Sequence, residues 1–196
     1  MDMFYLEVPS ISRKFDAIDY INENIQYNSD INGVGGLDRY LDDYEGWLVK
    51  LEEDYSRVPN EERVPGRTYF LIRESDNRII GMINIRLCLN DRLRRMGGHI
   101  GYDIRPTERG KGYNKINLYL GLKVCLEYGI DTVLLDADLN NPASWKTMEA
   151  LGGIRTDEYY DSEFYNCDVV KYSIDVNNAL ETYKDTYESL ISSKSI

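Results

Sequence analysis

A short cationic segment with two glycines, RPTERGKGYNK (residues 105–115), contains the residue types that point most directly to chemistry. Arg109, Gly110, Lys111 and Gly112 lie where a strand-like apolar run ends and a helical pattern begins. The first N–H groups of a helix have no partner within the helix and meet the positive end of its dipole, so such a turn can bind phosphate. The alternative is that the glycines only permit a tight turn.

Two common nucleotide-binding loops are excluded by the residues after Gly112. A Walker loop requires a serine or threonine close behind its second glycine, and this chain has Tyr113 and Asn114 there. A dinucleotide-binding loop requires a third small residue where Lys115 stands. The segment therefore predicts either an anion site of another type or a simple turn.

Three side chains near this segment could move protons. His99 is a candidate base because an unperturbed imidazole titrates near neutrality, although an isolated histidine is more often structural. Tyr102 lies on the same predicted strand, on the face opposite His99. Asp136 lies at the end of a later apolar run and is a second candidate base, whereas Asp138 has the character of a turn residue.

The elements that must position these residues follow from hydrophobic periodicity. Helical spacing predicts helices at 11–27, 37–51, 114–128, 142–151 and 178–191, and strand patterns predict strands at 67–74, 79–89, 97–104, 132–137, 153–160 and 169–176. The order strand, glycine loop, helix, strand over 97–137 indicates a βαβ unit with a parallel pair of strands. The sequence thus predicts one α/β domain with a mixed, mostly antiparallel sheet and a central parallel pair flanked by helices.

Local signals define the ends and faces of these helices. Phe15, Ile18, Ile21 and Ile25 recur at helical spacing, which predicts that they form the buried face of the first helix. Asn141 precedes a proline at the start of a later helical pattern and is predicted to cap that helix.

The chain from about residue 68 to 153 resembles the GNAT superfamily of N-acetyltransferases, and its uncharacterised bacterial members in particular. The resemblance rests on YDIRPTERGKGYNK followed by NNPASWKTMEALGG. In that family a Gln/Arg-x-x-Gly-x-Gly/Ala loop cradles the pyrophosphate of acetyl-coenzyme A, and it maps onto residues 107–112. The resemblance implies acetyl-coenzyme A as co-substrate, bound by Ile104, Arg109, Gly110, Lys111, Gly112, Tyr113, Asn114, Asn141 and Ser144.

Two positions depart from the family pattern. Thr107 stands where the loop begins with Gln or Arg, which implies weakened binding of the coenzyme. Met148 stands where many members have a tyrosine that protonates the departing thiolate. Another tyrosine then supplies the proton, or the thiolate leaves unaided. The candidates for catalysis are His99, Tyr102 and Asp136, and the rival interpretation is an acyl-coenzyme A sensor with little or no catalysis.

Composition bounds the partners. A net charge of -11 over 196 residues disfavours nucleic acids and anionic membranes and favours cationic or amine-bearing partners; the alternative is that the acidic surface only keeps the protein soluble. The resemblance then implies a primary amine of a small molecule or peptide as the acceptor. The acidic and tyrosine-rich segment 156–166 is either a loop that attracts this amine or a solvated hairpin end. Within the single domain 1–196, residues 1–66 are expected to shape the acceptor site and residues 67–153 to form the coenzyme-binding core. Residues 154–196 are expected to add the C-terminal strands and helix.

The remaining expectations concern metals, location and assembly. Three widely spaced cysteines and one histidine form no metal-ligand pattern, so no metal is expected. The sequence has neither an apolar run of 18 residues nor a cationic leader, which favours a cytoplasmic protein. A homodimer is a candidate assembly.

Overall fold

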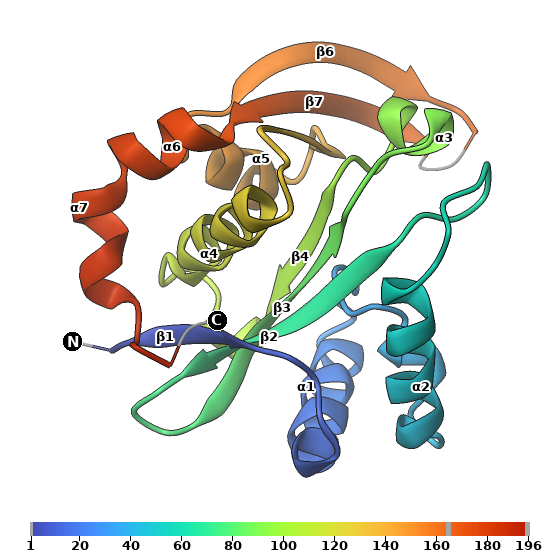
Figure 1. Cartoon of the computed structure of the whole chain (residues 1–196), viewed down its shortest axis with the longest axis vertical. Coiled ribbons are helices and arrows are strands. Elements are labelled where there is room, and N and C mark those ends of the chain that lie inside the picture. The colour runs from blue at the N-terminus through green and yellow to red at the C-terminus, as the bar shows by residue number, and fades with distance from the viewer. Residues whose placement is uncertain (1, 164–165, 195–196) are drawn as a thin grey trace.

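The strands of this computed structural model, which describes residues 2–163 and 166–194, form two antiparallel sheets (Figure 1). The first sheet has the order β1-β2-β3-β4, with β1 Phe4–Glu7, β2 Gly66–Arg73, β3 Arg78–Arg86 and β4 Ile100–Ile104. The second has the order β5-β7-β6, with β5 Thr132–Asp138, β6 Ile154–Asp161 and β7 Cys167–Asp175. The predicted α/β class and the mostly antiparallel pairing are confirmed.

Helices cover both faces of the first sheet (Figure 1). The helices are α1 Lys14–Gln26, α2 Tyr44–Tyr55, α3 Asp91–Arg95, α4 Tyr113–Glu127, α5 Pro142–Glu149, α6 Val176–Thr182 and α7 Lys184–Tyr187, with short 3-10 turns η1 Ile11–Arg13, η2 Leu37–Arg39, η3 Pro106–Glu108 and η4 Glu188–Leu190. No helix in the described ranges is long and apolar enough to cross a membrane.

The first sheet separates two apolar cores. Leu71 on β2 faces the core formed with α4, whereas its neighbour Phe70 faces the core under α1 and α2. Both side chains are fully buried. A strand buried on both faces has a nearly continuous apolar sequence, which explains the uninterrupted run in this part of the chain.

The two strands expected to form a parallel pair belong to different sheets. The His99 N–H donates to the Leu134 carbonyl at 2.7 Å, and the Leu134 N–H donates to His99 Nδ1 at 3.0 Å. The imidazole thus takes the hydrogen bond that a backbone carbonyl would accept in a continuing ladder. Gly98, with φ of 55°, turns the chain just before it. Over the described residues no further backbone hydrogen bond joins β4 to β5.

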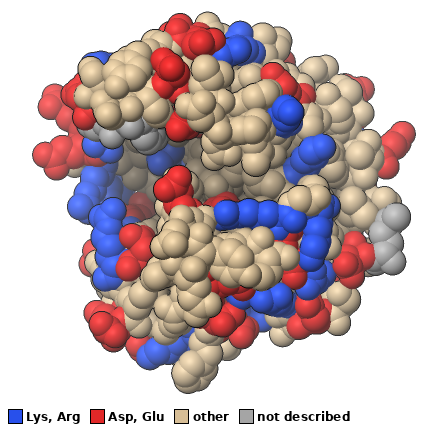
Figure 2. Space-filling view, turned by 180° about the vertical axis from the view of Figure 1, so that it is seen from behind, with Lys and Arg blue, Asp and Glu red and all other residues tan. Residues whose placement is uncertain are grey.

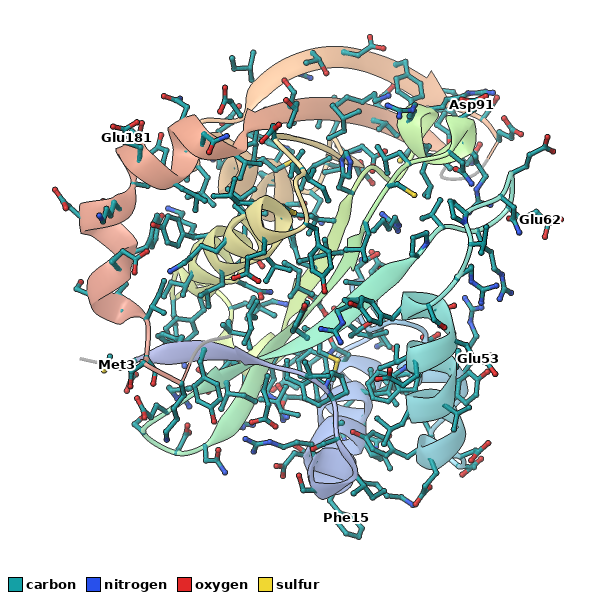
Figure 3. All side chains as sticks on the ribbon, in the orientation of Figure 1. Met3, Phe15, Glu53, Glu62, Asp91 and Glu181 are labelled. Atoms are coloured by element: carbon teal, nitrogen blue, oxygen red, sulfur yellow. The ribbon has the colours of Figure 1, made fainter. Side chains whose placement is uncertain are left out.

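The N-terminal helices differ from their predicted form. Phe15 is 84% exposed (Figure 3) and Ile25 is also exposed, so the predicted apolar face of α1 was wrong at these positions. The buried residues of α1 are Ala17, Tyr20, Ile21 and Asn24. The second helix begins at Tyr44 because Asp43 accepts the Gly46 N–H and caps it there.

The ends of the chain also show differences. β1 was not predicted; its four residues pair with β2 at the edge of the first sheet. The predicted C-terminal helix is broken near Tyr183 into α6 and α7. The last two predicted strands are confirmed as β6 and β7 within two residues at each end.

Candidate active site

The edge of β4 that faces β5 presents unpaired backbone groups. The Arg86 N–H donates to the His99 carbonyl, and the Arg105 N–H donates to the Ile80 carbonyl. Hydrogen-bonded positions alternate in an antiparallel pair, so the residues between them that point their N–H and C=O away from β3 are Ile100, Tyr102 and Ile104. An extended polar chain could pair with this edge as an added strand does.

The glycine segment leads from this edge into α4. Gly110 and Gly112 have φ of 77° and 81°, and a Cβ at either position would meet nothing within 4 Å. Their conformation favours glycine, and the space beside them is open. No acceptor for the backbone N–H groups of residues 110–114 is found in the described parts of the chain. The segment has the free donors and the room that a phosphate requires.

The cations of the loop anchor it to the fold. Arg109 donates from Nε to the Ile104 carbonyl at 2.8 Å and from Nη2 to Asp103 at 2.9 Å. Lys111 donates to Glu108 at 2.7 Å. The anion-binding capacity of the loop therefore resides in its backbone, while these side chains fix its shape.

Asp103 is a buried carboxylate that sequence reasoning missed. Burial raises its pKa to about 6, and the neighbouring Arg109 guanidinium opposes this rise. One of its oxygens is buried and finds no partner within the described residues. The signal in the sequence was an acid alternating with apolar residues on a buried strand.

Glu23 joins the same loop to α1. The Thr107 N–H and Oγ1 donate to Glu23 Oε1 at 3.0 and 2.8 Å. Arg105, whose side chain is 1% exposed, donates to Glu23 and Asp19 at 2.8 and 2.6 Å. Thr107, the departure from the family pattern, thus serves to hold the loop against the N-terminal helix.

Tyr102 crosses from β4 to α5. Its hydroxyl lies 3.1 Å from the Ser144 carbonyl and 3.2 Å from Ser144 Oγ. Asn141 caps α5 as predicted, accepting the Ser144 N–H at 3.3 Å. Burial raises the pKa of Tyr102, so the phenol keeps its proton at neutral pH. Met148 is buried in the core and offers no proton.

His99 and Asp136 lie together where β4 and β5 meet. Asp136 Oδ2 accepts the Gly97 N–H, and burial raises the pKa of this carboxyl. Burial lowers the pKa of His99 to about 4, with a further contribution from Arg94 and Arg86. The neutral imidazole uses Nδ1 as an acceptor, which leaves the proton on Nε2.

We expect His99→Gln to change how stability depends on pH. The unfolded imidazole takes up a proton near pH 6.5, before the folded one at about 4, so the wild type loses stability as pH falls through that window. The loss is at most about 3 kcal/mol. Urea unfolding at pH 7.5 and 4.5 should show a smaller decrease for the variant. An equal decrease in both proteins would contradict the assigned environment.

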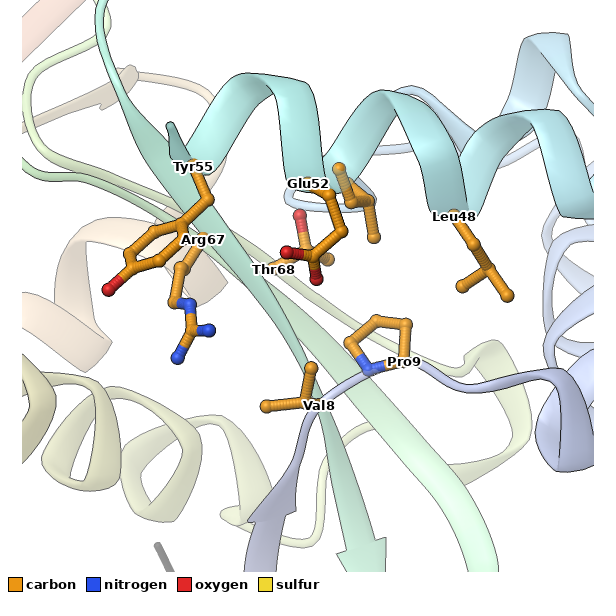
Figure 4. A pocket seen from close by; sticks show the side chains of 8 residues that line it. Val8, Pro9, Leu48, Glu52, Tyr55, Arg67 and Thr68 are labelled. Carbon is orange, nitrogen blue, oxygen red and sulfur yellow. The ribbon is translucent and has the colours of Figure 1, made fainter. Parts of the chain in front are cut away.

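The outer surface near β4 and β5 is hollowed. Figure 2 shows a hollow below the β6–β7 end of the molecule and above the end formed by α1 and α2, bordered by Lys and Arg side chains on the left and below. A separate cavity of about 90 Å³ lies between α2 and the start of β2 (Figure 4). There Arg67 stacks at 4.0 Å on the ring of Tyr55. The volume of this cavity is too small for a coenzyme.

The predicted site residues fall into two groups. The free edge of β4 and the start of α5 lie on either side of the gap bridged by Tyr102 and Ser144, and the glycine loop leads from β4 into α4. His99 and Asp136 lie at the closed end of that gap. The segment 156–166 forms most of β6 and the turn after it, and Phe164 and Tyr165 lie outside the described residues.

Known structures share this fold. The chain is similar to a spermidine/spermine N-acetyltransferase from Vibrio cholerae (15% identity, TM-score 0.62, 92% of this chain and 96% of that chain). It is also similar to a ribosomal-protein-S5-alanine acetyltransferase from Vibrio fischeri (13% identity, TM-score 0.64, 89% and 94%). No curated protein matches the sequence significantly.

The sequence itself assigns the family. Residues 36–152 match the profile of the acetyltransferase (GNAT) family, which spans the glycine loop and the α5 segment. The chain belongs to that family of acetyltransferases. The resemblance noted in the sequence is thereby confirmed.

Proposed function

We propose that this protein transfers the acetyl group of acetyl-coenzyme A to a primary amine of a small molecule or peptide. The observation that carries the proposal is the glycine loop, where two left-handed glycines leave open space beside five free N–H groups. The residues fit the coenzyme of the family, because the loop offers donors to a pyrophosphate and the β4 edge offers an amide ladder to an extended arm.

The coenzyme, when bound, supplies a thioester that an amine can attack. The edge N–H groups of β4 would orient the extended arm and stabilise the oxyanion formed on attack. Asn141 and Ser144 would contact the other side of the arm from the start of α5. A lysine-like amine, with a pKa of about 10.4, must first lose a proton. Asp136 is the better candidate base, because the His99 imidazole uses Nδ1 to accept the Leu134 N–H and carries its proton on Nε2.

Tyr102 is proposed to protonate the departing thiolate in place of the tyrosine that Met148 replaces. Its hydroxyl lies over the gap and retains its proton at neutral pH. We expect Tyr102→Phe to lower kcat about a hundredfold without changing the affinity for acetyl-coenzyme A, since general acid catalysis contributes at least this much. Steady-state kinetics measures both; an unchanged kcat would show that the thiolate leaves unaided.

Thermal melting with and without acetyl-coenzyme A tests the coenzyme-binding site. Acetyl-coenzyme A at about a hundred times its Kd should stabilise the fold by about 2.7 kcal/mol. No shift at millimolar concentration would refute the proposal. Release of free thiol in the presence of an amine panel then tests catalysis.

The alternative is a protein that binds acyl-coenzyme A as a sensor and transfers acetyl groups slowly or not at all. The buried Met148 at the position of the family acid favours this alternative. Melting shifts without thiol release from any amine would support it.

A further inference from the structure

A cavity of about 490 Å³ beside α2 gathers positive charge in an acidic protein. It is lined by Gly36, Arg39, Tyr40, Gly46, Val49, Lys50, Glu53, Arg57 and Arg63. Four of these side chains are cationic and one is acidic. The surrounding sequence carries more acidic than basic residues, whereas the lining of the cavity carries more basic than acidic ones.

Part of this charge is available to a ligand. Arg39 is 82% exposed at its side chain and reaches Asp38 only at 3.7 Å. Lys50 and Arg57 share the single carboxylate of Asp54. The guanidinium of Arg63 has no partner among the residues described. Among the residues that line the cavity, four cations and Glu53 leave a net positive charge, which the carboxylates of residues 38, 43 and 54 beside the lining balance.

Arg57 also presents an unsatisfied donor. Its Nε is buried and meets no acceptor in the described part of the chain, although Nη2 donates to Asp54 at 2.8 Å. A buried N–H without an acceptor costs free energy, and an oxygen supplied by a ligand would remove that cost. The planar guanidinium group matches the two oxygens of a carboxylate or phosphate.

The cavity lies close to the acceptor side of β4. Gly33 packs so closely on Gly101 that a Cβ there would lie 2.4 Å from the Gly101 carbonyl oxygen. Gly36, which lines the cavity, is three residues further on, and three residues span at most about 10 Å. The Cα of Gly36 therefore lies within about 10 Å of that of Gly33, which packs on β4.

The loop that carries Arg63 is fixed to the same side of the molecule. Asn90 donates from Nδ2 to the carbonyls of Asn60 and Glu61 at 3.1 and 2.8 Å, which joins this loop to α3. Figure 3 shows Glu53 on α2, Glu62 on the loop and Asp91 on α3 along one side. The cavity is thus bounded by α2 and by a loop held in place.

We propose that this cavity binds a carboxylate or phosphate group of the acceptor, whose amine is acetylated at the β4 edge. The inference rests on the proposed function and narrows its acceptor to amines that also carry an anionic group. Arg39 and Arg63 would attract such a group and repel a polyamine. The acceptor class therefore differs from the spermidine named for one structural relative.

The test uses the charge reversal Arg39→Glu with Arg63→Glu. The matched control is Arg155→Glu with Lys184→Glu, two exposed positions on β6 and α7 with the same change in net charge. Inorganic phosphate should raise the melting midpoint of the wild type and of the control above that in chloride at equal ionic strength. It should not raise the midpoint of the double reversal.

Acetyl transfer is compared for two lysine peptides, one with a glutamate and one with a glutamine about three residues from the lysine, and for spermidine. We expect the wild type to prefer the glutamate peptide in kcat/KM. The double reversal should lower this preference about tenfold, as loss of a charged contact does, with the KM for acetyl-coenzyme A unchanged. The control should keep the preference.

The outcomes separate the two proposals. Faster turnover of spermidine than of the glutamate peptide would overturn the inference and leave the proposed function intact. Absence of any phosphate-dependent stabilisation would overturn the inference whatever the turnover. Phosphate binding without acetyl transfer to any amine would overturn the proposed function and the acceptor role of the cavity together.

Discussion

Gly112→Trp is expected to abolish the rise in melting midpoint that the proposed function predicts for acetyl-coenzyme A. A side chain at this position would occupy the open space beside the free N–H groups at the start of α4. The residue must also adopt φ of 81°, which costs about 1–2 kcal/mol for a residue with a Cβ. Thermal melting with and without the coenzyme measures both effects.

Gly129→Trp is the matched control. Gly129 lies just beyond the other end of α4, has φ of 71°, and a Cβ there would also meet nothing within 4 Å. The control should lose similar stability and keep the full coenzyme-dependent shift. A shift that persists in Gly112→Trp would show that the cradle lies elsewhere.

Arg105→Met is expected to destabilise the protein by about 3–5 kcal/mol, the usual cost of removing one partner of a buried ion pair. The side chain of Glu23 is 11% exposed and would lose its shortest guanidinium contact. The Ile79 carbonyl would lose the Nε donor. Equilibrium unfolding in urea measures the change.

Two further variants identify the cause of this loss. Arg155→Met removes an ion pair with Glu158 whose side chains are about half exposed, and should cost less than about 1 kcal/mol. Adding Glu23→Gln to Arg105→Met should recover part of the stability, because it removes a largely buried carboxylate that keeps, among the described residues, only the longer ion pair of 3.3 Å to Arg78. A double variant less stable than Arg105→Met would indicate that packing, not charge, dominates.

The core elements could be predicted from the sequence because each has a clear period or cap. The turn between β2 and β3, the Asn141 cap and the glycine loop depend on local residue types, and the structure has each of them. β1 could not be predicted, because a four-residue strand is shorter than any periodic signal and depends on its pairing with β2.

The separation of β4 from β5 could not be predicted either, and the reason is different. The sequence identifies both strands and their order, but where they separate one imidazole accepts a distant backbone N–H. The same holds for Thr107 and Arg105, whose partner Glu23 lies more than 80 residues away. Contacts of this range leave no local pattern in the chain.

The bond between His99 and Leu134 has a thermodynamic consequence for ligand binding. The gap between β4 and β5 is held by the fold itself, through an imidazole that is uncharged above a pH of about 4. The conformational cost of separating the two strands therefore belongs to folding and is not subtracted from the affinity for the coenzyme. Preorganisation of this kind would favour coenzyme binding by a loop with few side-chain donors.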